Sequence, residues 1–278
     1  MMRTYPKKGK IINGVGRLQY VVIKDGEFNV AARPKIPADP AIKAIDFPAA
    51  ITDDNGTRYE VVKIDDNAFK GCPKLSSVIV ATNIREIGRS AFEDCPKLTY
   101  VQINSPLGTI HYGAFKKCSS LRTVVLHCPL KIIDGHAFEK CTHLSHIVLP
   151  ASVEEISDAA FMDNYSLLDL HLPEGLLNIG CRAFYNNQSL RTVSFPEGLT
   201  SIGSGAFGKC RKLNDINLKD TGMTVIEHST FMGCENLFSV ILPKGLQRIR
   251  PAAFDECPHL YLISIPGFSV SCHNRHNG

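Results

Sequence analysis

Ten cysteines in a chain of 278 residues could form disulfides or bind zinc, so their spacing decides which chemistry is open to them. Seven of them stand three residues after a Phe that recurs along the chain, and Asn takes the same position twice. A thiol that an amide can replace points to a small buried side chain that hydrogen-bonds to the turning backbone. This Cys/Asn ladder comprises Cys72, Cys95, Cys118, Cys141, Asn164, Asn187, Cys210, Cys234 and Cys257.

Neither a disulfide nor a zinc site fits this ladder. On stacked strands, successive positions would lie about 4.8 Å apart, within bridging distance, but their Cβ vectors would run parallel instead of converging. A line of thiolates also cannot form the tetrahedron that zinc prefers. We therefore predict reduced structural thiols, with no metal and no cofactor. Cys128, Cys181 and Cys272 lie outside the ladder, and we expect Cys272 to be the most exposed.

A second chemically active group comprises His146, Asp169 and His171. If successive repeats stack in register, His146 lies beside Asp169, and His171 lies two residues further along the same strand. A His and a carboxylate at neighbouring strand positions can share a proton or a cation. The same register places no third ligand, nucleophile or oxyanion hole, so we interpret the group as a polar patch on an exposed sheet. Metal-dependent or hydrolytic activity is kept as a distant alternative.

These residues are positioned by a repeat of 23 residues. An Ile stands five residues before each recurring Phe, and a Leu stands six residues after it. Nine copies of one unit at a fixed period indicate a solenoid, in which each unit buries its apolar side against its neighbours. The recurring residues are Phe69, Phe92, Phe115, Phe138, Phe161, Phe184, Phe207, Phe231 and Phe254.

Each repeat also predicts one short strand. From the Leu onward a copy reads Leu-x-x-Val-x-Leu, as at Leu121, Val124 and Leu126, and apolar residues at period two are typical of a strand with one buried face. Because each copy supplies a strand in the same direction, the strands are expected to stack in parallel over about 40 Å. The Ile and the Ala-Phe pair then fill the core from the opposite wall.

The ends of the chain depart from the repeat. Leu18–Ile23 and Glu27–Ala31 flank an Asp-Gly pair, which is typical of a hairpin. Residues 36–51 are interpreted as a degenerate copy with Ile36 in the place of the Phe. We predict three parts: an N-terminal cap at residues 1–61, nine repeats at 62–268, and a polar tail at 269–278 that leaves the last layer poorly covered.

The unit Ile-Gly-x-x-Ala-Phe-x-x-Cys-x-x-Leu, seen at Ile202–Leu213, resembles the BspA-like class of leucine-rich repeats. The resemblance implies an α/β-type leucine-rich repeat solenoid, a curved right-handed stack whose parallel β-sheet has about nine to ten short strands, with an N-terminal β-hairpin cap. It also implies a non-enzymatic protein, found on or outside cells and used for adhesion or other protein contacts. It implies no particular ligand.

The outward positions of the predicted sheet stand eight and ten residues after each Phe, and none of the eighteen is Lys or Arg. This disfavours nucleic acid as a partner, as does a net charge of only +4. Exposed apolar and aromatic residues favour protein contact instead. The candidate binding residues are Tyr100, Gln102, Val125, His146, Val148, Asp169, His171, Phe238, Ile241, Tyr261 and Leu262.

We therefore expect a binding module that contacts a protein or a surface glycan through this face. The alternative is a structural protein that self-associates end to end through its last layer. No run approaches the ~18 apolar residues of a membrane helix, so no membrane insertion is expected. The first ten residues are basic and have no apolar segment behind them. The location stays open between cytoplasmic and, if a leader has been removed, secreted or cell-surface.

Overall fold

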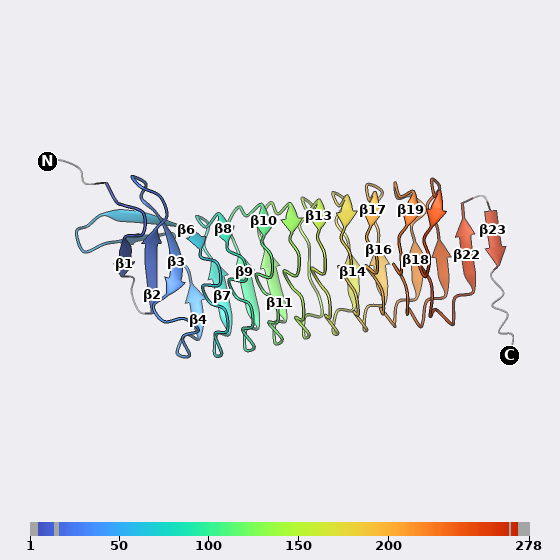
Figure 1. Ribbon diagram of the computed structural model, residues 1–278, viewed down its shortest axis with the longest axis horizontal. Coiled ribbons are helices and arrows are strands. Elements are labelled where there is room, and N and C mark those ends of the chain that lie inside the picture. The colour runs from blue at the N-terminus through green and yellow to red at the C-terminus, as the bar shows by residue number, and fades with distance from the viewer. Residues whose placement is uncertain (1–4, 14–16, 267, 272–278) are drawn as a thin grey trace.

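The computed structural model describes residues 5–13, 17–266 and 268–271, which wind into a β-solenoid (Figure 1). One turn of the solenoid, called a rank here, is one 23-residue repeat, and it carries strand segments on two of its sides. The Leu-x-x-Val-x-Leu segment forms the first column of strands. Its members are β4 (Ala44–Asp46), β7 (Ser77–Val80), β9 (Tyr100–Ile103), β11 (Thr123–Leu126), β14 (Asp169–His171), β16 (Thr192–Ser194), β18 (Asp215–Asn217), β20 (Ser239–Ile241) and β22 (Leu262–Ile265).

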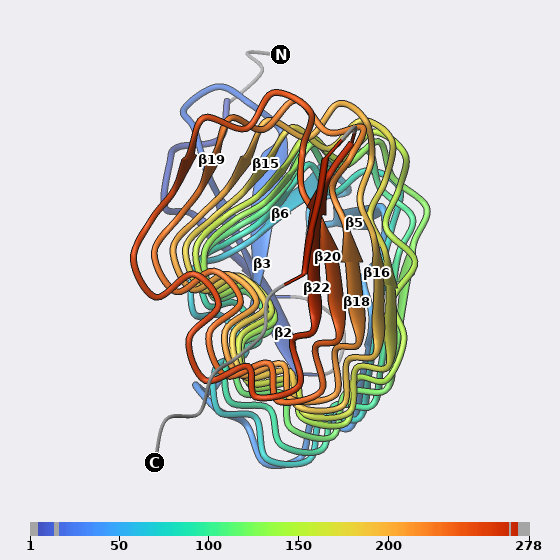
Figure 2. The same ribbon diagram turned by 90° about the vertical axis from the view of Figure 1, so that its right-hand side faces the viewer.

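The recurring Ile ends each strand of a second column. Its members are β6 (Arg58–Ile64), β8 (Glu86–Ile87), β10 (Thr109–Ile110), β12 (Ile132–Ile133), β13 (Glu155–Ile156), β15 (Asn178–Ile179), β17 (Ser201–Ile202), β19 (Val225–Ile226) and β21 (Arg248–Ile249). Viewed along the stack, the two columns lie on different sides of the core (Figure 2). The predicted parallel register is confirmed, since Val78 pairs with Val101 and Val101 pairs with Val124, each 23 residues on.

The predicted single sheet of nine to ten strands is divided into three parts. One contains β4, β7, β9 and β11, the next β14 and β16, and the last β18, β20 and β22. In the rank between β11 and β14 the backbone leaves ladder geometry, although Ile147 and Leu149 are still buried in the core. Packing of inward side chains therefore continues through the rank where the strand ladder is interrupted.

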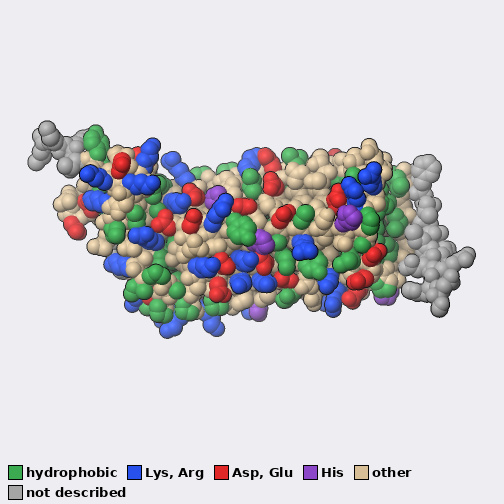
Figure 3. All heavy atoms as spheres, in the orientation of Figure 1, with side chains coloured by type: hydrophobic (Ala, Val, Ile, Leu, Met, Phe, Trp, Pro, Cys, Tyr) green, Lys and Arg blue, Asp and Glu red, His purple; other side chains and the backbone are tan. Residues whose placement is uncertain are grey.

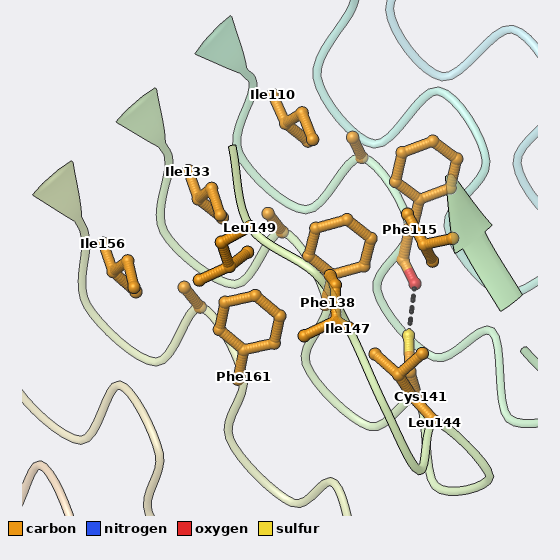
Figure 4. Packing of buried hydrophobic residues seen from close by; sticks show 14 of the residues in the cluster. Ile110, Phe115, Ile133, Phe138, Cys141, Leu144, Ile147, Leu149, Ile156 and Phe161 are labelled. Carbon is orange, nitrogen blue, oxygen red and sulfur yellow. Dashed lines mark hydrogen bonds between the residues drawn. The ribbon is translucent and has the colours of Figure 1, made fainter. Parts of the chain in front are cut away.

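The core is a column of stacked Phe rings. From Phe69 to Phe254, successive rings have centroids 5.2–5.7 Å apart and planes within 2–13° of parallel. Figure 4 shows Phe115, Phe138 and Phe161 in this stack beside the column of Ile residues. Each buried ring removes a large apolar area from water, and the contact between stacked rings adds further stabilisation. Because the ranks stack in register, each inner ring of the column therefore stacks on one ring in the rank before it and on one ring in the rank after it.

The α/β label is not met, because the described residues contain no helix. Two residues around each Phe adopt left-handed backbone geometry, such as His136 (φ 57°) and Lys140 (φ 61°) on either side of Phe138. Their N–H groups donate to carbonyls of the next rank, and Phe138 N donates to Ala160 O at 2.8 Å. A helix would need these groups to bond within their own segment. The hydrogen bonds between ranks take the place of helical ones. Among the described residues, there is also no helix that is long and apolar enough to cross a membrane.

The N-terminal residues form an extension of the second column. Strand β1 (Ile11–Asn13) pairs antiparallel with β2 (Leu18–Val22), and β2 pairs antiparallel with β3 (Asn29–Pro34). Strand β3 then pairs parallel with β6. Strand β5 (Ala50–Thr52) pairs antiparallel with the other edge of β6. The β2–β3 pairing has the Asp-Gly turn between its strands, at Asp25 and Gly26.

The assignment of Ile36 to the Phe position is wrong. Ile36 is 57% exposed, whereas Phe47 is buried and meets Phe69 edge-on, with ring centroids 5.6 Å apart. Phe47 follows its strand β4 instead of preceding it, so its ring enters the stack from the sheet side. The C-terminal part also differs from a simple polar tail, because β23 (Phe268–Ser271) pairs antiparallel with β22.

Candidate functional site

The outward side of the first column is called the strand face here. Its residues alternate with the core: in β9, Tyr100 and Gln102 are half-buried, while Val101 and Ile103 are fully buried. Neighbouring ranks bring their outward residues side by side, so that Gln102 pairs with Val125 of β11. The strand face is therefore a continuous surface whose outward residues are not constrained by the core.

Polar side chains near its N-terminal end form a hydrogen-bonded chain. Tyr100 Oη donates to Gln102 Oε1 at 2.6 Å, and Gln102 Nε2 donates to Asn104 Oδ1 at 2.9 Å. The Asn104 oxygen lies 3.2 Å from His127 Nδ1 of the next rank. These contacts hold Tyr100 and Gln102 in defined positions. The repeat pattern did not single out Asn104 and His127, because they lie just beyond the outward strand positions.

The most exposed apolar residue of the strand face lies near the centre of that face. Val148 is 83% exposed, and His146 is exposed two residues before it. Both belong to the rank that lacks a strand between β11 and β14. Val125 on the preceding rank is half-buried. This rank therefore presents side chains outward without the flanking ladder hydrogen bonds.

The structure does not join His146, Asp169 and His171 into a reactive group. Asp169 Oδ1 accepts a hydrogen bond from Thr192 Oγ1 at 2.6 Å, and His171 Nδ1 lies 3.2 Å from Ser194 Oγ. Among the described residues, no hydrogen bond links His146 to Asp169, and no three His, Cys, Asp or Glu side chains are placed to hold a metal ion. Asp169 and His171 thus each contact a hydroxyl group of the next rank.

An aromatic pair lies at the C-terminal end of the strand face. Phe238 and Tyr261 are 49% and 56% exposed, and their rings stack with centroids 5.8 Å apart at 14°. Each stands at the start of a strand, Phe238 before β20 and Tyr261 before β22. Ile241 and Leu262, on those two strands, are half-buried. These four side chains give an apolar corner, which we call the aromatic corner.

The ladder cysteines bond the backbone of the preceding rank. Cys141 Sγ donates to Phe115 O at 3.2 Å (Figure 4), and five further thiols make the same bond one rank apart. Burial raises the pKa of these thiols, to about 12 at Cys95 and Cys210 and to about 11 at Cys257. A thiolate is therefore disfavoured along the ladder.

Asparagine makes the corresponding hydrogen bond to the preceding rank at one of its two ladder positions and not at the other. Asn187 Nδ2 donates to Phe161 O at 3.0 Å and to Phe184 O at 2.7 Å. Asn164 is fully buried, yet its side-chain nitrogen and oxygen have no partner among the described residues. Of the cysteines outside the ladder, Cys128 is buried, Cys181 is exposed, and Cys272 lies outside the described residues.

Charged residues in the turns are paired between ranks. Lys70 Nζ lies 2.9 Å from Glu93, and Lys116 Nζ lies 2.7 Å from Glu139. On the face seen in Figure 3, basic and acidic side chains are interspersed along the stack. On that face the basic side chains therefore do not form the uninterrupted stripe that backbone phosphates require.

One hollow was not predicted from the sequence. It holds about 400 Å³ between β2, β3 and the turn that follows β6, and it is lined by Arg33, Lys35, Lys63 and Asp65 among others. These residues lie where the cap meets the first repeat, so no periodic signal connects them. The predicted boundary between the cap and the first repeat, at residue 61, was the available signal that this region departs from the repeat.

Comparisons with known proteins agree with the geometry. The profile of the BspA type leucine rich repeat region, in six copies, matches residues 57–168 and 154–274. The chain is similar in structure to a leucine-rich repeat protein from Bacteroides ovatus ATCC 8483, with 22% identity and a TM-score of 0.50 over 90% of this chain and 81% of that one. At this identity the likeness shows the fold alone.

Two further solved structures are similar at lower TM-scores. A leucine rich cell surface protein from Faecalibacterium prausnitzii A2-165 is 21% identical, with a TM-score of 0.44 over 93% of this chain and 95% of that one. The T. pallidum leucine rich repeat protein is 23% identical, with a TM-score of 0.43 over 90% of each chain. No curated protein matches the chain in sequence.

Proposed function

Because the chain belongs to the BspA-type leucine-rich repeat family, we propose that it is a binding module whose strand face contacts a protein or a surface glycan. Leucine-rich repeat proteins are generally non-enzymatic scaffolds. A solenoid offers an extended surface whose outward residues can change without disturbing the core. The proposal therefore concerns which part of that surface is used.

The aromatic corner carries the proposal. Phe238 and Tyr261 stack on each other while about half of each ring remains in water. Aromatic side chains that combine large apolar area with few rotatable bonds are enriched among the residues that dominate binding energy. Beside the corner, Ser239 Oγ donates to Asp215 Oδ1, which supplies a fixed polar group at the edge of the apolar area.

The test compares strand-face variants with turn variants. Tyr261→Ala, Tyr100→Ala and His171→Ala are measured against Lys97→Ala and Lys212→Ala for binding to a glycan array and to an array of secreted proteins. We expect loss of binding in the first set and retention in the second. Equal loss in both sets, or none in the first, would count against the strand face.

A second candidate function is end-to-end self-association, favoured by the last rank. Ile249 is 45% exposed, whereas the equivalent Ile residues of the other ranks, such as Ile226 and Ile202, are buried. Phe254 is likewise only half-buried at the end of the ring stack. Sedimentation at increasing concentration tests this candidate: a chain that stays monomeric at high concentration removes it, and Ile249→Lys should reverse any association.

A further inference from the structure

The hollow between the cap and the first repeat, which we call the cap pocket, is a second part of the molecule with the properties of a binding site. Its polar lining comprises Gln19, Arg33, Lys35, Lys63, Asp65, Asp66 and Asn67. Its volume of about 400 Å³ lies in the range of small-molecule sites. Pro34 and Pro37 supply apolar wall, so the pocket combines a small apolar surface with convergent polar groups.

Opposite charges in this pocket face each other without pairing. Arg33 is half-buried and its Nε atom is buried without a hydrogen-bond partner. Asp65 is also half-buried, and its carboxylate accepts no hydrogen bond from any described residue. Burial raises the pKa of Asp65, and the positive charges of Arg33 and Lys63 only partly oppose that shift. The buried Arg33 Nε donor that is left unmet is costly unless something else satisfies it.

The remaining polar groups divide into occupied and free ones. Lys63 Nζ is taken by Glu86 at 2.6 Å, and Asp66 Oδ1 accepts a hydrogen bond from Arg89 N at 2.9 Å. The Lys35 side chain is exposed and has no ion pair among the described residues. The cations left without an ion pair among the described residues are thus Arg33 and Lys35, and the acceptors left are the Asp65 carboxylate and the second carboxylate oxygen of Asp66.

We propose that the cap pocket binds a sugar residue that carries a carboxylate. The ligand carboxylate accepts hydrogen bonds from Arg33 and Lys35, and a ring hydroxyl donates to Asp65. A guanidinium matches a carboxylate with two parallel bonds, and a charge-assisted bond of this kind is among the stronger ones in proteins. A neutral sugar would leave the cations unmet, and a bare oxyanion would leave Asp65 unmet. This inference is independent of the strand face, since the pocket lies outside it.

The test titrates the full chain, labelled with ¹⁵N, with three probes: glucuronate, glucose and inorganic phosphate. Glucuronate is expected to bind with chemical-shift changes around residues 63–68, at least tenfold more tightly than glucose or phosphate. Phosphate binding that equals glucuronate binding would reduce the pocket to a simple anion site and overturn the proposal. Absence of glucuronate binding at this site would overturn it as well.

Variants separate the two halves of the interaction. Lys35→Ala and Arg33→Lys are expected to weaken glucuronate binding by about tenfold each, the equivalent of about 1.4 kcal/mol. Asp65→Asn should weaken glucuronate binding without weakening phosphate binding. Lys212→Ala, an exposed lysine in a distant turn, is the matched control. Lys35 is exposed, so its variant folds even if Arg33→Lys does not, and unchanged affinity in Lys35→Ala would contradict the proposal.

Because the cap pocket and the strand face are separate, the two proposals fail separately. Loss of glucuronate binding in the pocket variants with unchanged array binding supports both. If Tyr261→Ala removes array binding while glucuronate never binds, only the pocket proposal is lost.

Discussion

The thiol of Cys141 donates a hydrogen bond to the backbone carbonyl of Phe115, one rank earlier, at 3.2 Å. Both residues are fully buried, so that carbonyl has no access to water. Six ladder cysteines and Asn187 thus tie a rank to its predecessor at the point where the chain turns after the Phe. The same side chain packs the core and satisfies a backbone group.

Replacing Cys141 by Ala removes one of two hydrogen bonds to the Phe115 carbonyl, which keeps the bond from Cys118 N at 3.2 Å. The expected loss in the free energy of unfolding is about 0.5–1.5 kcal/mol, the usual net contribution of one hydrogen bond. Urea denaturation measures it, with the exposed Cys181→Ala as a control expected to change stability by less than ~0.5 kcal/mol. Equal stability of the two variants would show that the thiol bond contributes nothing.

The Phe stack predicts that position along the solenoid decides the cost of a lost ring. Phe138→Ala removes a fully buried ring that stacks on Phe115 at 5.4 Å and on Phe161 at 5.3 Å, and should cost about 3–5 kcal/mol. Phe254→Ala should cost less, because that ring is half-buried and, within the described part of the chain, stacks on Phe231 alone. Thermal and urea unfolding compare the two, and equal costs would contradict a stack sustained by neighbours.

Thiol reactivity should follow burial. Since the thiolate is the reactive form, the buried ladder cysteines, with pKa values raised to about 11 at Cys72 and about 12 at Cys95, should resist iodoacetamide at pH 8 in the folded protein. Cys181 is exposed and should be alkylated first. The experiment uses a Cys272→Ser background and peptide mass spectrometry. Modification of Cys95 as fast as Cys181 would be incompatible with this structure.

Gly203 should not tolerate a side chain. A Cβ at this position would lie 2.6 Å from the backbone nitrogen of Cys181, in the neighbouring rank, so the ranks would have to separate. We expect Gly203→Ala to cost about 1–3 kcal/mol, as other overpacked cores do. Gly245→Ala is the matched control, because its nearest atom would be 3.9 Å away. The melting temperatures of the two variants check the difference.

Asp53 should make stability depend on acid pH. A hydrogen bond from Lys10, opposed in part by burial and supported by the backbone N–H groups of Thr57 and Asn55, lowers its pKa to about 2. A carboxylate whose pKa is lowered on folding contributes stability that is complete above its unfolded pKa of about 3.9 and is lost as pH falls toward 2. As the pH is lowered from 6 to 2, the free energy of unfolding should therefore fall less steeply in Asp53→Asn than in the unmutated protein. Identical slopes would contradict the Lys10–Asp53 contact.

The repeat and its inward residues could be predicted because their signal is local and recurs nine times. Ile, Phe and Leu at constant spacing can be buried together only if the copies stack in register, and the Phe rings do stack that way. The α/β label implied by the resemblance was not met, and nothing in the sequence warned of this, because left-handed residues such as Ala159 (φ 54°) carry no distinctive side chain. Their geometry follows from hydrogen bonds to the next rank, which a single copy does not show.

The amino-acid sequence by itself determined the period, the parallel register and the identity of the core, because apolar burial at fixed spacing has one efficient solution. Only the tertiary structure decided that Phe47 enters the ring stack in place of Ile36, that the sheet is interrupted at His146, and that Arg33 faces Asp65 across a hollow. These features depend on contacts between segments that share no periodicity, so their residues carry no common pattern along the chain.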